Sequence, residues 1–333
     1  MVRRIGDVIL EVEDLHTYIF TGFGTVKAVD GVSFSLRQGE ALAIVGESGS
    51  GKSMTALSLL RLQPKPAARI VKGAIRLEGE DLLKKTEKEM RQIRGKRISM
   101  ILQDPQTSLN PVFTVGNQLI EAIRNHHTGE NKPTLVRRAV EALKQVRVAA
   151  PDRRVEDYPH QISGGMKQRV VGAIAISCEP KVIIADEPTT SLDVTIQAQY
   201  LRLLREIQQE TNLALIFITH DFGIVAKMCD RVVVMYAGRH VESGPVREIF
   251  NRPSHPYTQA LLRSVPSMDE DVERLASISG QPPALWDLPE GCRFAPRCEY
   301  AMDICRQEYP PSFKVGDNGS THTASCWRLR KTT

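Results

Sequence analysis

The fold class follows from thirteen consecutive residues, Ala41-Leu42-Ala43-Ile44-Val45-Gly46-Glu47-Ser48-Gly49-Ser50-Gly51-Lys52-Ser53. The first five are apolar, as in a short buried strand, and the other eight match the phosphate-loop motif G-x-x-x-x-G-K-[ST]. Glycines let backbone N–H groups approach phosphate oxygens closely, and the helix that follows adds its positive end. Lys52 supplies a charge for the phosphates, and the Ser53 hydroxyl is placed to bind Mg²⁺. The candidate nucleotide-binding residues here are Gly46, Ser48, Gly49, Ser50, Gly51, Lys52 and Ser53.

Further apolar runs indicate the rest of an α/β fold. Buried strands are predicted at Ala41–Val45, Ile98–Leu102, Val182–Ala185, Leu215–Thr219 and Arg231–Met235. They alternate with helical patterns, such as the apolar face formed by Ile196, Tyr200, Leu203, Leu204 and Ile207. This alternation favours a mainly parallel sheet flanked by helices. Shorter antiparallel strands are expected at Ile9–Val12, Ser33–Leu36 and Gly73–Leu77.

Two changes of pattern suggest domain boundaries. Strand signals disappear between about 104 and 178, where Thr134 is expected to cap a helix that carries Val136, Val140, Leu143 and Val146. Prolines and four of the six cysteines gather after about Asn251. We therefore predict an ATP-binding core with an antiparallel β subdomain over 1–103 and 179–250, a helical subdomain over 104–178, and a loop-rich C-terminal domain over 251–333.

Two adjacent acids, Asp186 and Glu187, end the predicted strand that begins at Val182. Their side chains point in different directions, because residues alternate along a strand. Such a pair can simply be a solvated strand end or a helix cap. Together with the phosphate loop, the pair is interpreted as catalytic, with Asp186 binding Mg²⁺ and Glu187 polarising the water that attacks the γ-phosphate.

A third motif is Ile162-Ser163-Gly164-Gly165-Met166-Lys167-Gln168-Arg169, which opens an apolar helical stretch. Alone it is a helix start with a serine cap. With the other motifs, however, it resembles the signature motif of ABC transporter nucleotide-binding subunits, apart from Ile162 and Met166, where Leu and Gln are more usual. The resemblance implies that Ser163, Gly164 and Gly165 meet the γ-phosphate of ATP bound to an opposite chain, so that catalysis needs a dimer.

The resemblance also implies roles for isolated positions. Gln103 matches the glutamine loop, which contacts Mg²⁺ or water, and His220 matches the switch histidine at the γ-phosphate. Thr190-Ser191-Leu192-Asp193 matches the D-loop, which crosses to the other subunit. Phe23 lies where the family stacks an aromatic ring on adenine, with Tyr18 and Phe20 as nearby alternatives.

Three longer stretches resemble one branch of the family, the ATP-binding subunits of oligopeptide, dipeptide and nickel importers. They are Gln103–Pro111, His255–Leu262 and Gly291–Cys298. The resemblance implies an ATPase that uses ATP and Mg²⁺ to energise import of peptides or related solutes, such as nickel chelates. The implied partners are two integral-membrane permease subunits, a homologous second ATPase or a second copy, and indirectly an extracytoplasmic solute-binding protein. The implied location is peripheral, on the cytoplasmic side of the membrane.

Four cysteines, Cys292, Cys298, Cys305 and Cys326, form a separate candidate site. They lack the C-x-x-C pairs of zinc ribbons and the spacing of ferredoxins. In a reducing compartment, four gathered cysteines favour metal ligands over disulfides. Members of the importer branch carry an iron–sulfur cluster on four such cysteines, so a [4Fe–4S] cluster is expected here, with zinc or free or oxidised thiols as alternatives. Cys178 and Cys229 are expected to be buried packing residues.

Composition leaves few other classes open. The 44 Lys and Arg against 39 Asp and Glu give a net charge of +5 with both signs interspersed, and aromatic residues make up 5%. The charge is only a weak bias toward anionic partners. The low aromatic content disfavours a platform for single-stranded nucleic acid, and we expect no nucleic-acid partner. No apolar run approaches the roughly 18 residues of a membrane-spanning helix, and no secretory signal is expected at the N-terminus. The alternatives are a soluble ABC-type ATPase of DNA repair or translation, and a redox or metal-sensing protein that leaves the nucleotide motifs unused.

Overall fold

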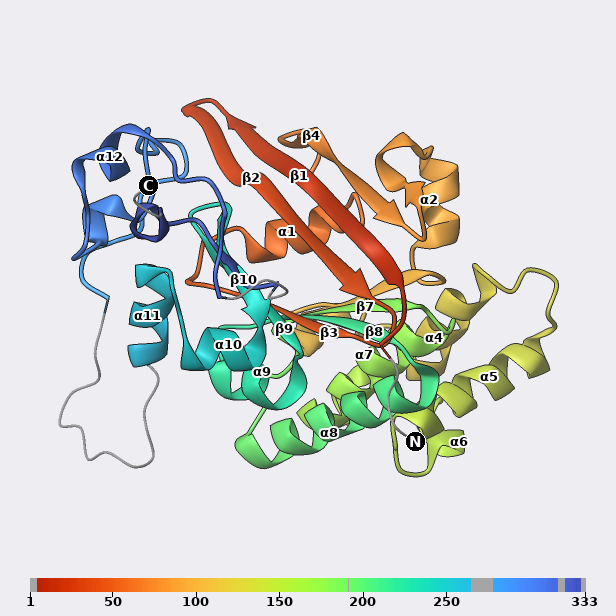
Figure 1. Ribbon diagram of the computed structural model, residues 1–333. Coiled ribbons are helices and arrows are strands. Elements are labelled where there is room, and N and C mark those ends of the chain that lie inside the picture. The colour runs from red at the N-terminus through yellow and green to blue at the C-terminus, as the bar shows by residue number, and fades with distance from the viewer. Residues whose placement is uncertain (1–4, 191, 265–277, 317–320, 331–333) are drawn as a thin grey trace. The chain divides into compact units, whose positions relative to one another are not determined.

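The computed structural model describes residues 5–190, 192–264, 278–316 and 321–330 (Figure 1). The chain divides into two compact units. One consists of Met1–Asp7, Arg37–Glu40 and Lys84–Phe217, and the other of Val8–Leu36, Ala41–Leu83 and Ile218–Thr333. We call them the signature unit and the loop unit, because they contain the signature motif and the phosphate loop respectively.

The loop unit contains a four-stranded sheet with strand order β2-β1-β4-β5. Its strands are β1 (Val8–Thr21), β2 (Gly24–Arg37), β4 (Ala68–Leu77) and β5 (Glu80–Asp81). The first three contain the predicted short strands but are much longer than expected. Two polar residues, Thr17 in β1 and Asp30 in β2, interrupt the apolar pattern from which a longer strand would be predicted. Both are buried in the structure.

A second set of strands in the loop unit has the order β11-β12-β10-β9-β3. The phosphate-loop strand β3 (Ala41–Val45) is parallel to β9 (Arg231–Tyr236), with Leu42 opposite Arg231 and Val45 opposite Val234. The other three are antiparallel: β10 (Arg239–Pro245), β12 (Thr323–Ala324) and β11 (Phe313–Lys314). Both parallel strands confirm the sequence prediction. Helices of this unit are α1 (Lys52–Leu59), α9 (Phe222–Met228), α10 (Val246–Asn251), α11 (Pro256–Arg263) and α12 (Asp303–Gln307), with short 3₁₀ turns at Leu82–Lys84, Ala295–Arg297 and Trp327–Leu329.

The signature unit has strands in the order β8-β7-β6. They are β6 (Ile98–Ile101), β7 (Val182–Asp186) and β8 (Ala214–Ile218), within two residues of their predicted bounds. Its helices are α2 (Glu87–Ile93), α3 (Pro105–Ser108), α4 (Val115–Arg124), α5 (Lys132–Gln145), α6 (Pro151–Arg154), α7 (Gly164–Ile176) and α8 (Val194–Thr211), with a 3₁₀ turn at Pro159–Gln161. Among the described residues of 104–178 there are helices and turns but no strand.

The predicted cap of α5 is wrong. The capping residue is Asn131, whose side chain accepts the N–H of Thr134 at 3.1 Å. The helix begins earlier than predicted because Pro133 lies in its first turn, where proline needs no hydrogen bond. The helix buries Leu135, Ala139 and Leu143, whereas Val136 is only half-buried.

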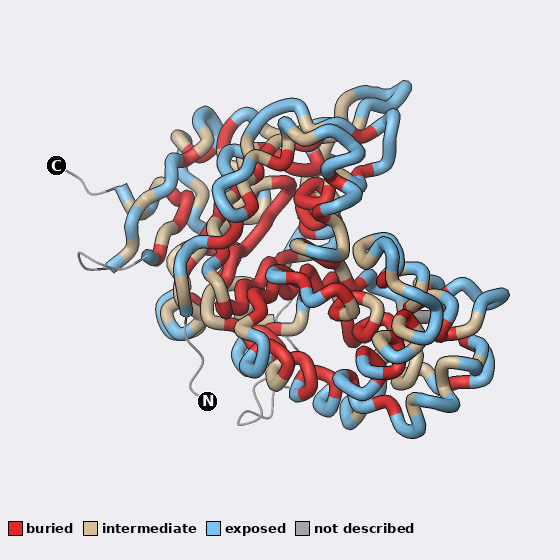
Figure 2. Tube along the Cα trace, turned by 90° about the vertical axis from the view of Figure 1, so that its right-hand side faces the viewer, coloured by how far each residue is buried: buried red, intermediate tan, exposed pale blue. Residues whose placement is uncertain are grey.

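The core is most complete along the parallel strands. Every residue of β3, β7 and β8 is buried, as expected for strands covered on both faces, and buried positions are red in Figure 2. Within the described part of the chain, no helix combines the length and apolarity needed to cross a bilayer.

Candidate functional site

The phosphate loop has a backbone that only glycine can supply at two points. Gly46 has φ 151° and Gly51 has φ 102°. A Cβ atom on Gly46 would lie 2.1 Å from the carbonyl oxygen of Met235, and one on Gly51 would lie 2.2 Å from that of Ala28. Packing against neighbouring strands therefore excludes any side chain at these two positions of the motif.

Lys52 begins α1 and is buried, and its ammonium group stays within the loop. Its Nζ donates to the carbonyl oxygens of Gly46 at 2.8 Å and Glu47 at 2.9 Å. Ser48, Gly49 and Ser53 are exposed beside it. The loop thus presents a cation together with accessible backbone at the start of a helix, an arrangement suited to a polyanion.

Two residues that are not part of the predicted site, Tyr257 and Arg297, form hydrogen bonds with the loop. The Glu47 N–H donates to the Tyr257 hydroxyl at 2.8 Å, and the Glu47 carboxylate forms two hydrogen bonds with Arg297, at 2.7 and 3.0 Å. The only sequence signal for them was their position within the two C-terminal stretches that resemble the importer branch.

In the signature unit, the structure brings two of the predicted catalytic residues together. Glu187 follows β7 with φ 44°, and its Oε2 accepts hydrogen bonds from Gln103 Nε2 at 2.9 Å and from Thr190 Oγ1 at 3.0 Å. The neighbouring Asp186 is the buried last residue of β7. The acids therefore differ in surroundings, with Asp186 inside the unit and Glu187 half-exposed among polar groups.

Two other predicted residues begin helices of the same unit. Exposed Ser163 caps α7, where its hydroxyl accepts the N–H of Met166 at 3.4 Å, and the half-buried Gly164 and Gly165 form the first turn. Asp193 caps α8 through the N–H of Ile196 at 2.9 Å. The D-loop residue Ser191 lies outside the described residues.

The remaining nucleotide candidates belong to the loop unit. His220 is exposed just after β8. Phe23 is fully exposed in the turn between β1 and β2. Its two alternatives are engaged elsewhere, since the Tyr18 hydroxyl donates to Asp30 at 2.6 Å and the Phe20 ring lies 5.6 Å from the Arg69 guanidinium.

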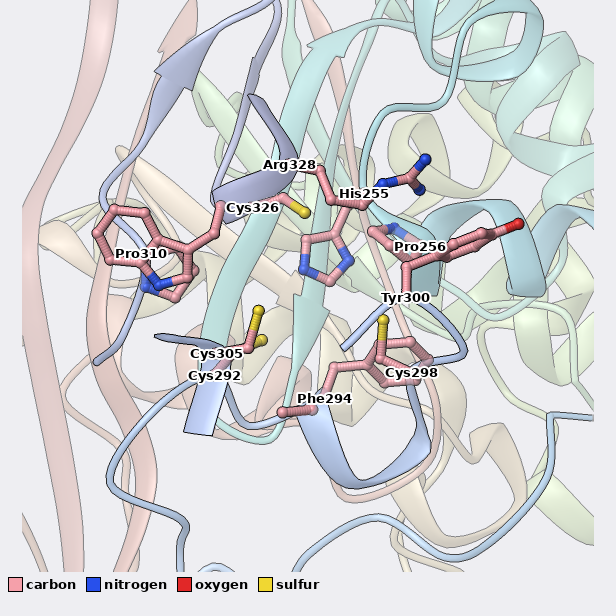
Figure 3. A pocket seen from close by; sticks show the side chains of 12 residues that line it. His255, Pro256, Cys292, Phe294, Cys298, Tyr300, Cys305, Pro310, Cys326 and Arg328 are labelled. Carbon is pink, nitrogen blue, oxygen red and sulfur yellow. The ribbon is translucent and has the colours of Figure 1, made fainter. Parts of the chain in front are cut away.

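The four C-terminal cysteines line one small pocket of the loop unit, together with His255 and Phe294 (Figure 3). Burial raises the pKa of Cys292 to about 11, and it also raises the pKa of the Cys298 and Cys326 thiols. No group of three or more His, Cys, Asp or Glu side chains among the described residues is arranged to hold a metal ion. Cys178 and Cys229 are buried, as predicted.

Comparisons with known proteins agree with these motifs. A family model described as ABC transporter matches residues 29–190, and one described as the C-terminal region of oligopeptide/dipeptide transporters matches residues 241–305. The oligopeptide transport ATP-binding protein OppD of Bacillus subtilis is 50% identical over 322 residues, which are 96% of this chain and 89% of the relative. The dipeptide transport ATP-binding protein DppD of Escherichia coli is 50% identical over 309 residues, which cover 93% and 94%.

Solved structures give the same result for the fold. CbiO1 of Clostridium perfringens, part of the ABC transporter complex CbiONQ, has a TM-score of 0.63 at 29% identity and covers 74% of this chain and 92% of that one. A bacterial ABC transporter cassette solved as a dimer has a TM-score of 0.64 at 25% identity, with coverage of 72% and 99%.

Proposed function

Since this chain belongs to the ABC transporter family, among its oligopeptide and dipeptide transport ATP-binding proteins, we propose that it hydrolyses ATP to energise peptide import. The observation that carries this proposal is the extent of the similarity. Relatives about half identical match almost the whole chain, including the C-terminal region as well as the ATP-binding part. Import of a related solute, such as a nickel chelate, is the second candidate, since the importer resemblance covers it as well.

The chemistry is assigned to residues as follows. Lys52 and the loop amides bind the phosphates, Glu187 orients the attacking water and takes its proton, and His220 contacts the γ-phosphate. Mg²⁺, when bound, neutralises charge on the phosphate oxygens, and its proposed ligands are Ser53, Gln103 and Asp186. These are oxygen donors, the type that Mg²⁺ prefers. The Gln103 and Thr190 hydrogen bonds support the role of Glu187 because they fix the direction of its carboxylate.

The proposed assembly contains two ATPase subunits and two integral-membrane permease subunits, on the cytoplasmic side of the membrane. Ser163, Gly164, Gly165 and Asp193 would act on ATP bound to the opposite ATPase chain, which is a homologue or a second copy. Phe23 would stack on the adenine, which its full exposure permits. An extracytoplasmic protein would deliver the solute. We also propose the domain boundaries predicted from the sequence, which follow residues 103, 178 and 250.

We also propose that the cysteine pocket binds a [4Fe–4S] cluster with a structural role. Four thiols around one pocket match the ligand set of such a cluster. A single zinc ion would need sulfur atoms within about 2.3 Å of one point. A four-iron cluster is larger and takes one thiolate on each iron, so it would use all four cysteines that line the pocket. Because the thiol pKa values are raised, cluster binding must displace protons.

The proposed function is tested by reconstitution. The chain would be assembled in lipid vesicles with the permease subunits of a peptide importer, and ATP hydrolysis and uptake of a labelled dipeptide would be measured together. Uptake that requires ATP and disappears in Lys52→Ala is the expected result. Hydrolysis stimulated by DNA but not by the permease would favour the DNA-repair alternative and overturn the proposal.

A further inference from the structure

An acidic residue lies inside the loop that binds a polyanion. Glu47 is the second residue of the phosphate loop, and an ionised carboxylate there would repel a triphosphate. Both oxygens of its side chain, however, accept hydrogen bonds from the Arg297 guanidinium, at 2.7 and 3.0 Å. Arg297 belongs to the 3₁₀ turn just before Cys298, so the charge is balanced from the C-terminal region.

The Arg297 side chain is held firmly enough to act as an anchor. It is only 4% exposed, compared with 26% for Glu47. Its Nε donates to the carbonyl oxygen of Ser279 at 3.0 Å, and the guanidinium lies 5.8 Å and 5.9 Å from the rings of Tyr236 and Phe294. The hydrogen bonds to Glu47 raise the pKa of Arg297 despite burial, so the guanidinium stays charged. A two-bond pair of this kind also fixes direction.

A second arginine of the same segment, Arg293, is connected to the phosphate loop through a neighbouring turn. Arg293 pairs with buried Asp30 and donates to the carbonyl oxygen of Ala237. The next residue, Gly238, donates its N–H to the carbonyl oxygen of Ser50 at 2.9 Å. The segment Cys292–Cys298 thus reaches the phosphate loop at two places, directly at Glu47 and through the turn at Gly238.

From these contacts we infer that the segment Cys292–Cys298 braces the phosphate loop and that Arg297 is a positioning residue for ATP binding. Arg297 does two things for the loop. It neutralises the Glu47 carboxylate, and it keeps the start of the loop in the conformation whose amides bind phosphate. This inference rests on the proposed function, because it assumes that the loop binds ATP.

The test measures the dissociation constant of Mg·ATP for the full chain by calorimetry. We expect Arg297→Ala to weaken binding by roughly fivefold or more, within the usual range of coupling between sites. Arg297→Lys, which keeps the charge but loses the paired geometry, should fall between Ala and wild type. The control is Arg263→Ala on α11, where the side chain donates only to the carbonyl oxygen of Gln259 among the contacts described, and its ATP affinity should equal that of wild type.

A double variant distinguishes the loss of charge balance at Glu47 from general damage to the fold. If an unpaired Glu47 carboxylate is the cause, Arg297→Ala combined with Glu47→Gln should bind ATP more tightly than Arg297→Ala alone, and added salt should reduce the defect of the single variant. Equal affinities of Arg297→Ala and Arg263→Ala, or no recovery in the double variant, would overturn the inference. Lys52→Ala tests the proposed function separately. If this variant binds Mg·ATP as tightly as wild type, the proposed function is overturned, and this inference with it.

Discussion

At the scale of single residues, hydrogen bonds fix the orientation of the charged side chains of the site. Glu187 adopts a positive φ at the end of β7, and donors from Gln103 and Thr190 converge on one of its oxygens. In the proposed mechanism this carboxylate orients the attacking water and accepts its proton. A glutamine would keep the shape of this side chain but could not accept a proton.

Glu187→Gln is therefore expected to bind ATP normally and to lower hydrolysis by about 100-fold or more in the assembled transporter, the usual loss on removing a general base. ATP binding and phosphate release would be measured on the same preparation. Glu210→Gln, at the exposed end of α8, is the matched control and should hydrolyse at the wild-type rate. A near-normal rate for Glu187→Gln would show that another group activates water.

The electrostatic contribution of Asp30 to the stability of the fold should depend on pH. Burial raises its pKa, but the Tyr18 hydroxyl, Arg293 and Arg239 outweigh burial and hold the pKa well below the ordinary 3.8. A depressed carboxyl pKa stabilises the fold fully above the ordinary value, and this contribution disappears as pH falls toward the folded pKa.

Asp30→Asn should consequently destabilise the protein at pH 7 by on the order of 3 kcal/mol, as expected when a buried ion pair loses one partner. The difference from wild type should shrink as pH falls below the ordinary carboxyl pKa of 3.8. Urea unfolding at several pH values measures it. Glu13→Gln, which removes an exposed pair with Arg76, is the control and should have little effect. A pH-independent difference would contradict the electrostatic explanation.

At the scale of elements, the described residues of the C-terminal segment after α11, 278–316 and 321–330, form little regular structure. Around the cysteine pocket its elements are two 3₁₀ turns, Ala295–Arg297 and Trp327–Leu329, the five-residue α12 and two strands of two residues each. Such short elements bury little apolar surface, so a bound cluster would be a main source of local stability.

Cys305→Ser is expected to lower the iron content of anaerobically purified protein from about four per chain to near zero, because a four-cysteine cluster loses a ligand. Limited proteolysis should then cut the C-terminal segment faster. Cys178→Ser, which changes a buried cysteine of the signature unit, is the matched control and should keep the iron. One zinc per wild-type chain, or thiols without metal, would refute the cluster.

At the scale of the whole molecule, one chain contains one phosphate loop and one signature motif. If each signature acts on the ATP of an opposite chain, an isolated chain cannot complete a site. The isolated subunit should therefore bind Mg·ATP but hydrolyse it slowly, with a rate per chain that rises with protein concentration. Hydrolysis assays across a dilution series, combined with light scattering, measure this. A monomer with a fast, concentration-independent rate would rule out the composite site.

Local sequence was sufficient for the parallel strands because their signals are short-range. An apolar run followed by glycines and a lysine predicts β3, the loop and α1 without knowledge of any other element. The same reasoning was wrong for the cap of α5, where proline in the first turn moved the start of the helix to Lys132. It also predicted β1 and β2 too short, because a buried Thr17 or Asp30 cannot be told from a solvent-facing residue until its partners are known.

Those partners are a matter of tertiary structure, since they lie far apart along the chain. Gln103 and Glu187 are separated by 84 residues, Glu47 and Arg297 by 250, and Asp30 and Arg293 by 263. A charged side chain in a sequence carries no information about which distant charge will face it, because hydrogen bonds and ion pairs act only at short range in the folded chain. The motifs alone therefore predict a nucleotide-binding loop, whereas only the folded chain shows that Arg297 and Tyr257 form hydrogen bonds with Glu47 of that loop.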